Sequence, residues 1–385
     1  MKRILLSSAA VFAFAGAAAA DGHIGISFSG SAELGFNDTD HSAVADLVAG
    51  NVDADDTNAA VLAVDDNFGF YSDLDFTVMF AAELDNGLTA AASMNMDDFV
   101  ASAGSNNGVN YELSLTSATS GLYYGDTNFA AQNVWVSAGD MESDGFSEAD
   151  GEEVLRGEAT FGNVSAQMSY AIGTRVAGAS DVEQLSLGVS ADFGNVNVVA
   201  AYQDAASAAY TASRAGGVDA DGDTLVTSAA NGDFNGNEVF GISVGTTFSG
   251  ADVRVAYADN SVTNSTGVRV SYPFGPVTAT AYYVSESMGG DNWGLNLAYA
   301  NGPIAVTLDL QDDQGVEKWS LEGSYDVGNG LVIYAGADDA GDDYYIGGEY
   351  DLGSGASLLV SYADDSDGDE DSDDDDIGAR DYQVG

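Results

Sequence analysis

Residues 184–193 read QLSLGVSADF, and residues 292–299 read NWGLNLAY. In both stretches an apolar residue occupies every second position, and polar or small residues lie between them. Successive side chains of a β-strand point to opposite faces, so this alternation predicts strands with one apolar and one polar face. The same alternation is present in 154–161 (VLRGEATF) and recurs toward the end of the chain. The sequence therefore predicts an all-β fold.

Two kinds of turn alternate between these strands. Short turns contain Gly or Asn, which supply the positive φ angles of tight hairpins. They are Gly162-Asn163, Gly194-Asn195, Ser249-Gly250, Gly275-Pro276, Asn301-Gly302, Gly328-Asn329-Gly330 and Gly353-Ser354-Gly355. The long connections are acidic or rich in Gly, Ser and Asn, and they are 173–183, 204–237, 260–266, 286–291, 311–316, 338–343 and 364–376. Short turns at one end and long loops at the other are typical of an outer-membrane barrel.

Aromatic residues mark both ends of the predicted strands. One row precedes the short turns: Phe161, Phe193, Phe248, Phe274, Tyr299, Tyr325 and Tyr350. A second row precedes long loops: Tyr170, Tyr202, Tyr257, Tyr283 and Tyr362. Two membrane–water interfaces select such rows, whereas a soluble β-sandwich would use its aromatic residues in the core. The pattern favours a transmembrane antiparallel up-and-down β-barrel with short periplasmic turns and long extracellular loops.

The first half of the chain is less regular but fits the same plan. Its expected strands are 23–36, 67–84, 88–97, 109–116 and 122–126, with long connections at 37–66 and 127–153. One N-terminal strand, nine hairpins and a C-terminal strand beginning near Ile377 give a direct count of twenty strands. Counts of sixteen or eighteen remain open, and an even number is expected for a bacterial barrel.

The N-terminus resembles an export signal. Met1-Lys2-Arg3 is positive, residues 4–17 are mostly apolar, and Ala18-Ala19-Ala20 has the small side chains of a cleavage site. We therefore expect a secretory signal peptide over 1–20 and a barrel domain over 21–385. No later stretch has the roughly 20 apolar residues that a spanning helix needs.

The composition excludes several classes of protein. The chain has 385 residues, no cysteine, 62 Asp and Glu against 9 Lys and Arg, and a formal net charge of −53. Such a charge repels nucleic acid, and without cysteine there is no disulfide scaffold or thiolate metal site. Only His23 and His41 could act as near-neutral bases, and neither has a convincing serine partner. We therefore expect that the protein is not an enzyme.

Several stretches together resemble the general bacterial porins of Gram-negative bacteria, in particular the alphaproteobacterial, Rhodobacter-type branch. They are GISFSGSAELGF (25–36), DNGLTAAASMNMDD (85–98), LYYGDTNFAAQNVW (122–135) and the repeated hairpins that follow. The resemblance implies a homotrimer of barrels in the outer-membrane lipid, each with a water-filled pore narrowed by its third loop. Members usually have sixteen strands and end on an aromatic residue, whereas this chain ends in DYQVG (381–385).

A diffusion pore needs charges at its narrowest point. The connection 127–153 is the candidate constriction loop, and its acids are Asp140, Glu142, Asp144, Glu148, Asp150, Glu152 and Glu153. The resemblance assigns these acids to the inserted loop only as a group, and solvated surface acids are the alternative reading.

Lysine and arginine are absent between Asp21 and Leu155, where family members usually carry the bases that face the loop acids. Further along, four bases fall on the polar faces of strands: Arg156, Arg254, Arg269 and Lys318. The lumen should therefore be negative nearly throughout, and clefts of one sign concentrate counter-ions. The sequence predicts a preference for cations.

Two acidic stretches imitate part of a calcium loop. They contain Asp219, Asp221 and Asp223 around Gly222, and Asp365, Asp367 and Asp369 around Gly368. Hard oxygen ligands at this spacing suit Ca²⁺, but the bidentate Glu and flanking helices of an EF-hand are missing. Solvated charge is the alternative, and no cofactor is required.

Together these observations predict an outer-membrane porin for passive diffusion of ions and small hydrophilic solutes. One alternative is a solute-specific channel, since the long loop 204–237 could form a binding path. Another is a secreted acidic calcium-binding β-protein or adhesin. Liposome swelling with sugars of graded size separates the first two, and extraction without detergent would favour the third.

Overall fold

The computed structural model describes residues 7–12, 14–19, 25–39, 67–96, 109–148, 153–176, 179–206, 234–338 and 344–364. Nearly all of the regular structure in these residues is β-strand, and the strands form one sheet. The short helix α2 (Ala130–Val134) follows β7. No helix in the described part of the chain is long and apolar enough to cross a membrane.

The strands are numbered in chain order, from β1 near the N-terminus to β21 near the C-terminus. They are β1 (Ser7–Phe12), β2 (Phe14–Ala19), β3 (Gly25–Thr39), β4 (Asn67–Glu83), β5 (Thr89–Met96), β6 (Val109–Thr116), β7 (Ser120–Gly125), β8 (Glu153–Phe161), β9 (Val164–Val176), β10 (Ala179–Phe193), β11 (Val196–Gln203), β12 (Val239–Phe248), β13 (Ala251–Asp259), β14 (Asn264–Phe274), β15 (Val277–Glu286), β16 (Asn292–Asn301), β17 (Ile304–Asp313), β18 (Val316–Gly328), β19 (Leu331–Asp338), β20 (Tyr344–Gly353) and β21 (Ala356–Asp364).

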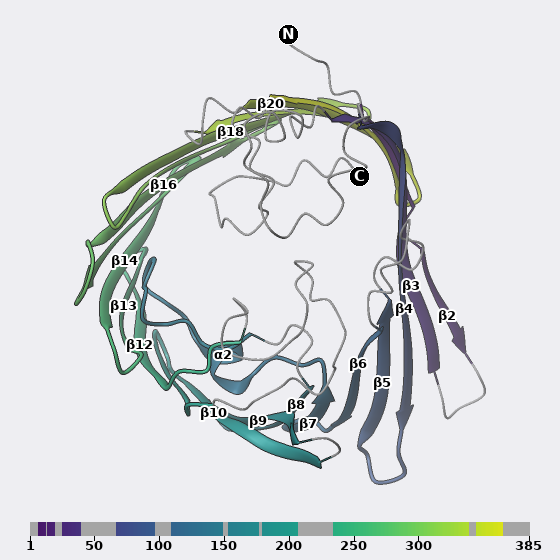
Figure 1. The fold of residues 1–385 in the computed structure, drawn as a ribbon. Coiled ribbons are helices and arrows are strands. Elements are labelled where there is room, and N and C mark those ends of the chain that lie inside the picture. The colour runs from purple at the N-terminus through teal and green to yellow at the C-terminus, as the bar shows by residue number, and fades with distance from the viewer. Residues whose placement is uncertain are drawn as a thin grey trace, which may run out of the picture.

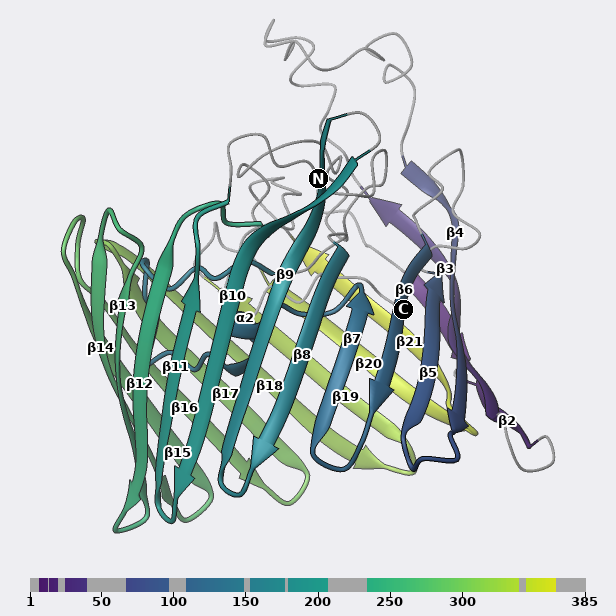
Figure 2. The same ribbon diagram turned by 90° about the horizontal axis from the view of Figure 1, so that it is seen from below.

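From β3 to β21 each strand pairs antiparallel with the next one in the chain. The sheet curls into a ring when viewed along its axis (Figure 1), and its strands are inclined to that axis (Figure 2). The predicted up-and-down antiparallel architecture is confirmed. These nineteen strands comprise one N-terminal strand and nine hairpins, as predicted from the sequence.

The short turns lie where the sequence predicts them. Gly162, Gly194 and Gly275 have φ angles of 65°, 74° and 64°, in the left-handed region that glycine adopts without steric cost. In each case a second turn residue follows, and the chain then reverses into the next strand. These turns gather at one end of the ring (Figure 2).

Two predicted long loops are wrong. Residues 311–316 form the end of β17, a tight turn at Gln314 and Gly315, and the start of β18, because both turn residues adopt left-handed φ angles of 48° and 93°. The Gly315 N–H also donates to Asp312 Oδ1 at 2.9 Å, which stabilises the turn. Strands β9 and β10 likewise extend through most of 173–183.

The outer face of the ring carries exposed apolar side chains. Of the predicted row before the short turns, Phe161 and Phe248 are 74% and 73% exposed. Leu155, on the same strand as Phe161, and Val255, on β13, are also exposed. No protein covers these apolar side chains in the described structure, and contact with hydrocarbon would remove them from water. A lipid environment therefore suits this face.

The N-terminal segment lies at the seam between the two ends of the sheet. Strand β1 pairs antiparallel with β21, and β2 pairs antiparallel with β3. Within the described residues, β3 pairs with β2 and β4, β21 pairs with β1 and β20, and β3 and β21 do not pair with each other. Most of the expected signal peptide therefore occupies strand positions in this structure, and its cleavage after Ala20 stays a prediction. The C-terminal strand expected near Ile377 lies outside the described residues.

Candidate pore constriction

The segment 126–148, between β7 and β8, turns into the ring instead of extending away from it. Helix α2 lies inside the ring in Figure 1, near β10. From there the chain runs along the inner wall as far as β16, where Asn292 Nδ2 donates to the carbonyl oxygen of Asp140 at 3.1 Å. We call residues 126–148 the inserted segment.

Apolar contacts hold the inserted segment against the wall. Its buried apolar residues pack in three clusters: Phe129 with the wall residues Val154 and Ala171 and with Phe234, which precedes β12; Ala131 and Phe146 with Ala201 and Val239; and Ala138 and Met141 with Ala256, Ala258 and Val284. The inner wall therefore carries apolar side chains in three places where the segment covers it. The alternation predicted a wholly polar inner face, and these apolar side chains were missed.

Hydrogen bonds anchor the backbone of the segment to polar wall side chains. Four N–H groups donate to buried acceptors: Ala130 to Ser169 Oγ at 2.9 Å, Ala131 to Ser186 Oγ at 2.8 Å, Ser143 to Ser265 Oγ at 3.0 Å, and Ser147 to Gln203 Oε1 at 2.7 Å. Buried backbone donors cost free energy when unpaired, so these wall side chains stabilise the inward path.

Glycines in the wall make room for the segment. A Cβ on Gly188 would lie 2.3 Å from the carbonyl oxygen of Ala130, in α2. A Cβ on Gly241 would lie 2.5 Å from the ring of Trp135. Such distances are far below van der Waals contact, so a larger residue at either position would displace the segment.

The loop acids spread along the segment. Carboxylate oxygens of Asp140, Glu142 and the wall residue Asp313 all lie within 4.8 Å of one another. The N–H of Glu142 donates to Oε1 of Glu286 at 3.2 Å, which adds a fourth carboxylate to this patch. Exposed acidic groups of this kind are common without a bound ion, and we assign the patch to the electrostatics of the lumen.

Of the remaining predicted acids, Asp144 accepts a hydrogen bond from Trp135 Nε1 at 2.8 Å, and Glu148 accepts one from Gln132. Asp150 and Glu152 lie outside the described residues. So do all six calcium candidates: Asp219, Asp221, Asp223, Asp365, Asp367 and Asp369.

Glu153 does not join the loop acids. It begins β8 and shares the outer face of that strand with Leu155, while Val154 and Arg156 point inward. Its two carboxylate oxygens accept hydrogen bonds from Tyr111 at 2.7 Å and Tyr124 at 2.9 Å. The expected place of Glu153 in the constriction is therefore corrected, because strand alternation resumes before it.

The predicted bases have different surroundings. Arg156 is buried and forms a salt bridge of 3.1 Å with Glu158, donates to Thr127 Oγ1 at 3.0 Å, and lies over the Tyr123 ring. It fixes the start of the inserted segment, and Glu158 neutralises its charge. Arg254 and Arg269 lie side by side on β13 and β14 and line recesses in the wall.

A family model described as Gram-negative porin matches residues 7–223 and 205–371, which together span most of the sequence. The chain belongs to the Gram-negative porin family. It is therefore an outer-membrane protein of a channel family, and not of an enzyme family. The predicted recognition and outer-membrane location are confirmed.

Solved structures similar to this porin include engineered variants of the porin from Rhodopseudomonas blastica. A multiply substituted variant is 12% identical with a TM-score of 0.43, and the alignment covers 94% of this chain and 99% of that chain. A triple mutant is 13% identical with a TM-score of 0.42, and the coverage is again 94% and 99%. No curated protein sequence matches the chain.

The inserted segment of this porin shifts the titration of two of its acids. Burial raises the pKa of Asp144 to about 7, although the hydrogen bond from Trp135 opposes the shift. Asp140 is exposed to the lumen on one side, but burial on the other raises its pKa to about 6, and repulsion from Asp313 adds to the shift. Lys318 lies close enough to Asp140 to oppose the shift in its pKa.

Proposed function

We propose that this porin is a cation-preferring diffusion channel for ions and small hydrophilic solutes, assembled as a trimer in the outer membrane, with the inserted segment as its constriction. The observation that carries the proposal is the patch of four carboxylates, contributed by Asp140, Glu142, Glu286 and Asp313, at the contact between segment and wall.

The distribution of bases supports the sign of this preference. Strands β3 to β6 lie across the ring from β13 and β14 (Figure 1), and they contain no lysine or arginine. Arg156 is neutralised by Glu158, which leaves few free positive charges on the described inner wall. A lumen lined by one sign of charge raises the local concentration of counter-ions and excludes co-ions.

The channel performs no bond chemistry. A polar solute stays hydrated in the water-filled lumen, whereas it would lose its hydration in the hydrocarbon of the membrane. The lumen therefore lowers the free-energy barrier to crossing the membrane, and the solute diffuses down its concentration gradient. The inserted segment narrows the lumen, and its carboxylates bias passage toward cations. Outer-membrane lipid surrounds the exposed apolar face.

The cation preference is tested by reversal potentials across a planar bilayer in a KCl gradient. We expect the reversal potential to have the sign of a channel that is more permeable to K⁺ than to Cl⁻. Anion selectivity would contradict the proposal. Raising the ionic strength is the control, because the screening length shrinks from about 10 Å at 0.1 M to about 3 Å at 1 M salt. An electrostatic preference must weaken under those conditions, whereas a purely steric one would not.

Export should remove the N-terminal segment. We expect cleavage after Ala20, because the positive start, apolar stretch and small residues fit a signal peptide. N-terminal sequencing and intact mass of the protein purified from outer membranes should give Asp21 as the first residue. A mature chain that retains residues 7–19 would show instead that β1 and β2 are permanent strands.

A further inference from the structure

Two arginines occupy opposite positions on neighbouring strands of the inner wall. Arg254 on β13 and Arg269 on β14 are direct partners in the strand register. Like charges placed opposite each other in a sheet repel and lower its stability. In a chain with a formal net charge of −53, two adjacent unneutralised bases therefore call for an explanation.

Among the residues that the structure describes, no carboxylate forms an ion pair with either arginine. In the part of the chain that the structure describes, only neutral groups accept from Arg254: Ser243 Oγ at 2.6 Å and Asn197 Oδ1 at 3.3 Å. Gly245 leaves space for this side chain along the wall, since a Cβ there would lie 2.7 Å from Nη2. The guanidinium of Arg254 is thus positioned in advance, and Arg269 retains its capacity to bind an oxyanion.

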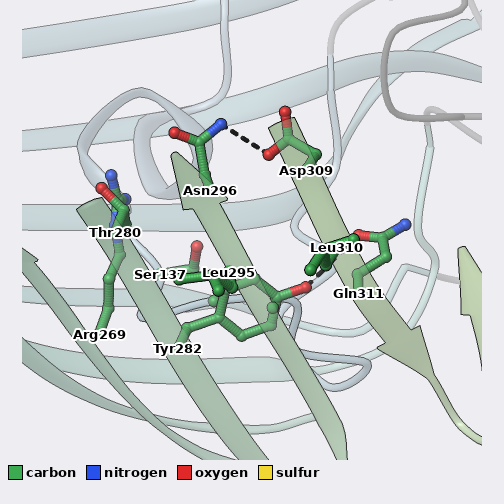
Figure 3. A pocket seen from close by; sticks show the side chains of 11 residues that line it. Ser137, Arg269, Thr280, Tyr282, Leu295, Asn296, Asp309, Leu310 and Gln311 are labelled. Atoms are coloured by element: carbon green, nitrogen blue, oxygen red, sulfur yellow. Dashed lines mark hydrogen bonds between the residues drawn. The ribbon is translucent and has the colours of Figure 1, made fainter. Parts of the chain in front are cut away.

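Two recesses meet at Arg269, immediately beside the inserted segment. A recess of about 520 Å³ is lined by both arginines and by Val136. A second recess, of about 480 Å³, is lined by Arg269 together with Ser137 and Gly139 (Figure 3). A solute that passes the constriction along this wall therefore meets the arginine pair.

The recesses also contain carboxylates that are held apart from the arginines by neutral donors. These are Asp192, which accepts from Asn197 Nδ2 at 2.9 Å, Asp252, which accepts from Thr247 Oγ1 at 2.6 Å, and Asp309, which accepts from Asn296 Nδ2 at 2.6 Å (Figure 3). Among the described residues, none of the three lies within salt-bridge distance of either guanidinium. Separate positive and negative groups are therefore present in each recess.

We propose that these recesses form a subsite for small zwitterionic solutes that carry both a carboxylate and an ammonium group. The carboxylate binds the Arg254–Arg269 pair, and the ammonium faces Asp192, Asp252 or Asp309. Guanidinium groups suit carboxylates because their N–H donors match the two acceptor oxygens. The inference rests on the proposed cation-preferring channel and names a solute class for it.

The sign of the lumen explains why a zwitterion fits better than a simple anion. A negative lumen excludes anions before they reach the arginines. Cations enter, but they gain nothing from two guanidinium groups. A solute with no net charge is not excluded, and it can satisfy both kinds of group in one recess.

The test compares three solutes of nearly equal size in proteoliposome swelling: L-alanine, the uncharged lactamide and the anion lactate. The wild-type channel should admit alanine severalfold faster than lactamide, and lactate more slowly than alanine. Arg269→Gln and, independently, Arg254→Gln should bring the alanine-to-lactamide ratio close to one. The control is Ser324→Asp on the inner face of β18, which makes the same change in net charge away from both recesses and should leave the ratio high.

Each outcome decides the proposal. A wild-type ratio near one overturns the subsite, and so does a ratio that the arginine variants leave unchanged or one that Ser324→Asp lowers equally. Lactate faster than alanine would show an anion site instead. Wild-type liposomes that swell with none of these solutes would refute the channel itself, which distinguishes failure of the proposed function from failure of the subsite. The alanine-to-lactamide ratio of the wild-type channel tests the subsite even if a variant fails to fold.

Discussion

Replacing residues 128–151 by a short Gly-Ser linker is expected to raise the single-channel conductance severalfold. The inserted segment covers the inner wall from β8 to β16, and residues 234–237 pack against only part of it, through Phe234 and Asn235. The conductance of a water-filled pore rises with its cross-section, so removal of this segment should widen the narrowest part. Planar bilayer recordings in KCl measure the change.

Folding of the shortened chain is checked by the different gel mobility of heated and unheated samples in SDS, which reports an intact barrel. A shortened barrel that is intact but conducts as before would show that ions do not pass the inserted segment. The cation preference should also fall in the same variant, because the excision removes Asp140, Glu142 and Asp144.

Lowering the pH from about 8 to about 5 is expected to weaken the cation preference strongly, with most of the change between about pH 7 and about pH 6. Asp144 and Asp140 have pKa values raised by burial to about 7 and about 6. Each carboxyl is negative above its pKa, so the constriction loses these charges in turn as the pH falls. Ordinary surface acids would change the preference only near about pH 4. Reversal potentials at fixed ionic strength measure the effect.

Asp144→Asn is the matched variant, since it keeps the size of the side chain and removes the group that titrates near pH 7. It should abolish the upper part of the pH dependence and leave the part near pH 6.

The same pKa shifts have a consequence for the stability of the inserted segment. A raised pKa in the folded state means that the packed segment holds protons more tightly than an unfolded one, so its attachment is strongest at acid pH and weakens as the pH rises toward 7. A preference that stays constant down to about pH 5 would contradict this account.

The strands were predictable because the two faces of a barrel strand meet different solvents. In 184–193 and 292–299 the alternation is unbroken, and β10 and β16 form there. Turns with Gly162 or Gly194 were predictable for a local reason, the left-handed backbone. The turn at Gln314 and Gly315 was missed because acidic neighbours made 311–316 resemble a polar loop.

The path of the inserted segment was not predictable from local pattern. Its position depends on contacts with strands far along the chain, such as Ser143 with Ser265. One signal was present: β11 reads Val199-Ala200-Ala201-Tyr202, with apolar residues on both faces. Small apolar residues on an inner face predict that something covers it. Arg254 and Arg269 were predicted as inner-face bases, but their register as partners required the strand pairing.

Strand parity at the seam has a consequence for biogenesis. The number of strands from β3 to β21 is nineteen, which is odd, so β3 and β21 run in the same direction. These two edge strands therefore cannot pair with each other in antiparallel orientation. In this structure β1 runs opposite to β21, and β2 runs opposite to β3. Unpaired backbone groups in hydrocarbon cost several kcal/mol each. If cleavage after Ala20 removes β1 and β2, as we expect, another stretch of opposite direction must therefore close the ring. A precursor that kept residues 1–20 would offer β1 and β2 to the two ends of the sheet, so we expect the timing of cleavage to affect barrel assembly.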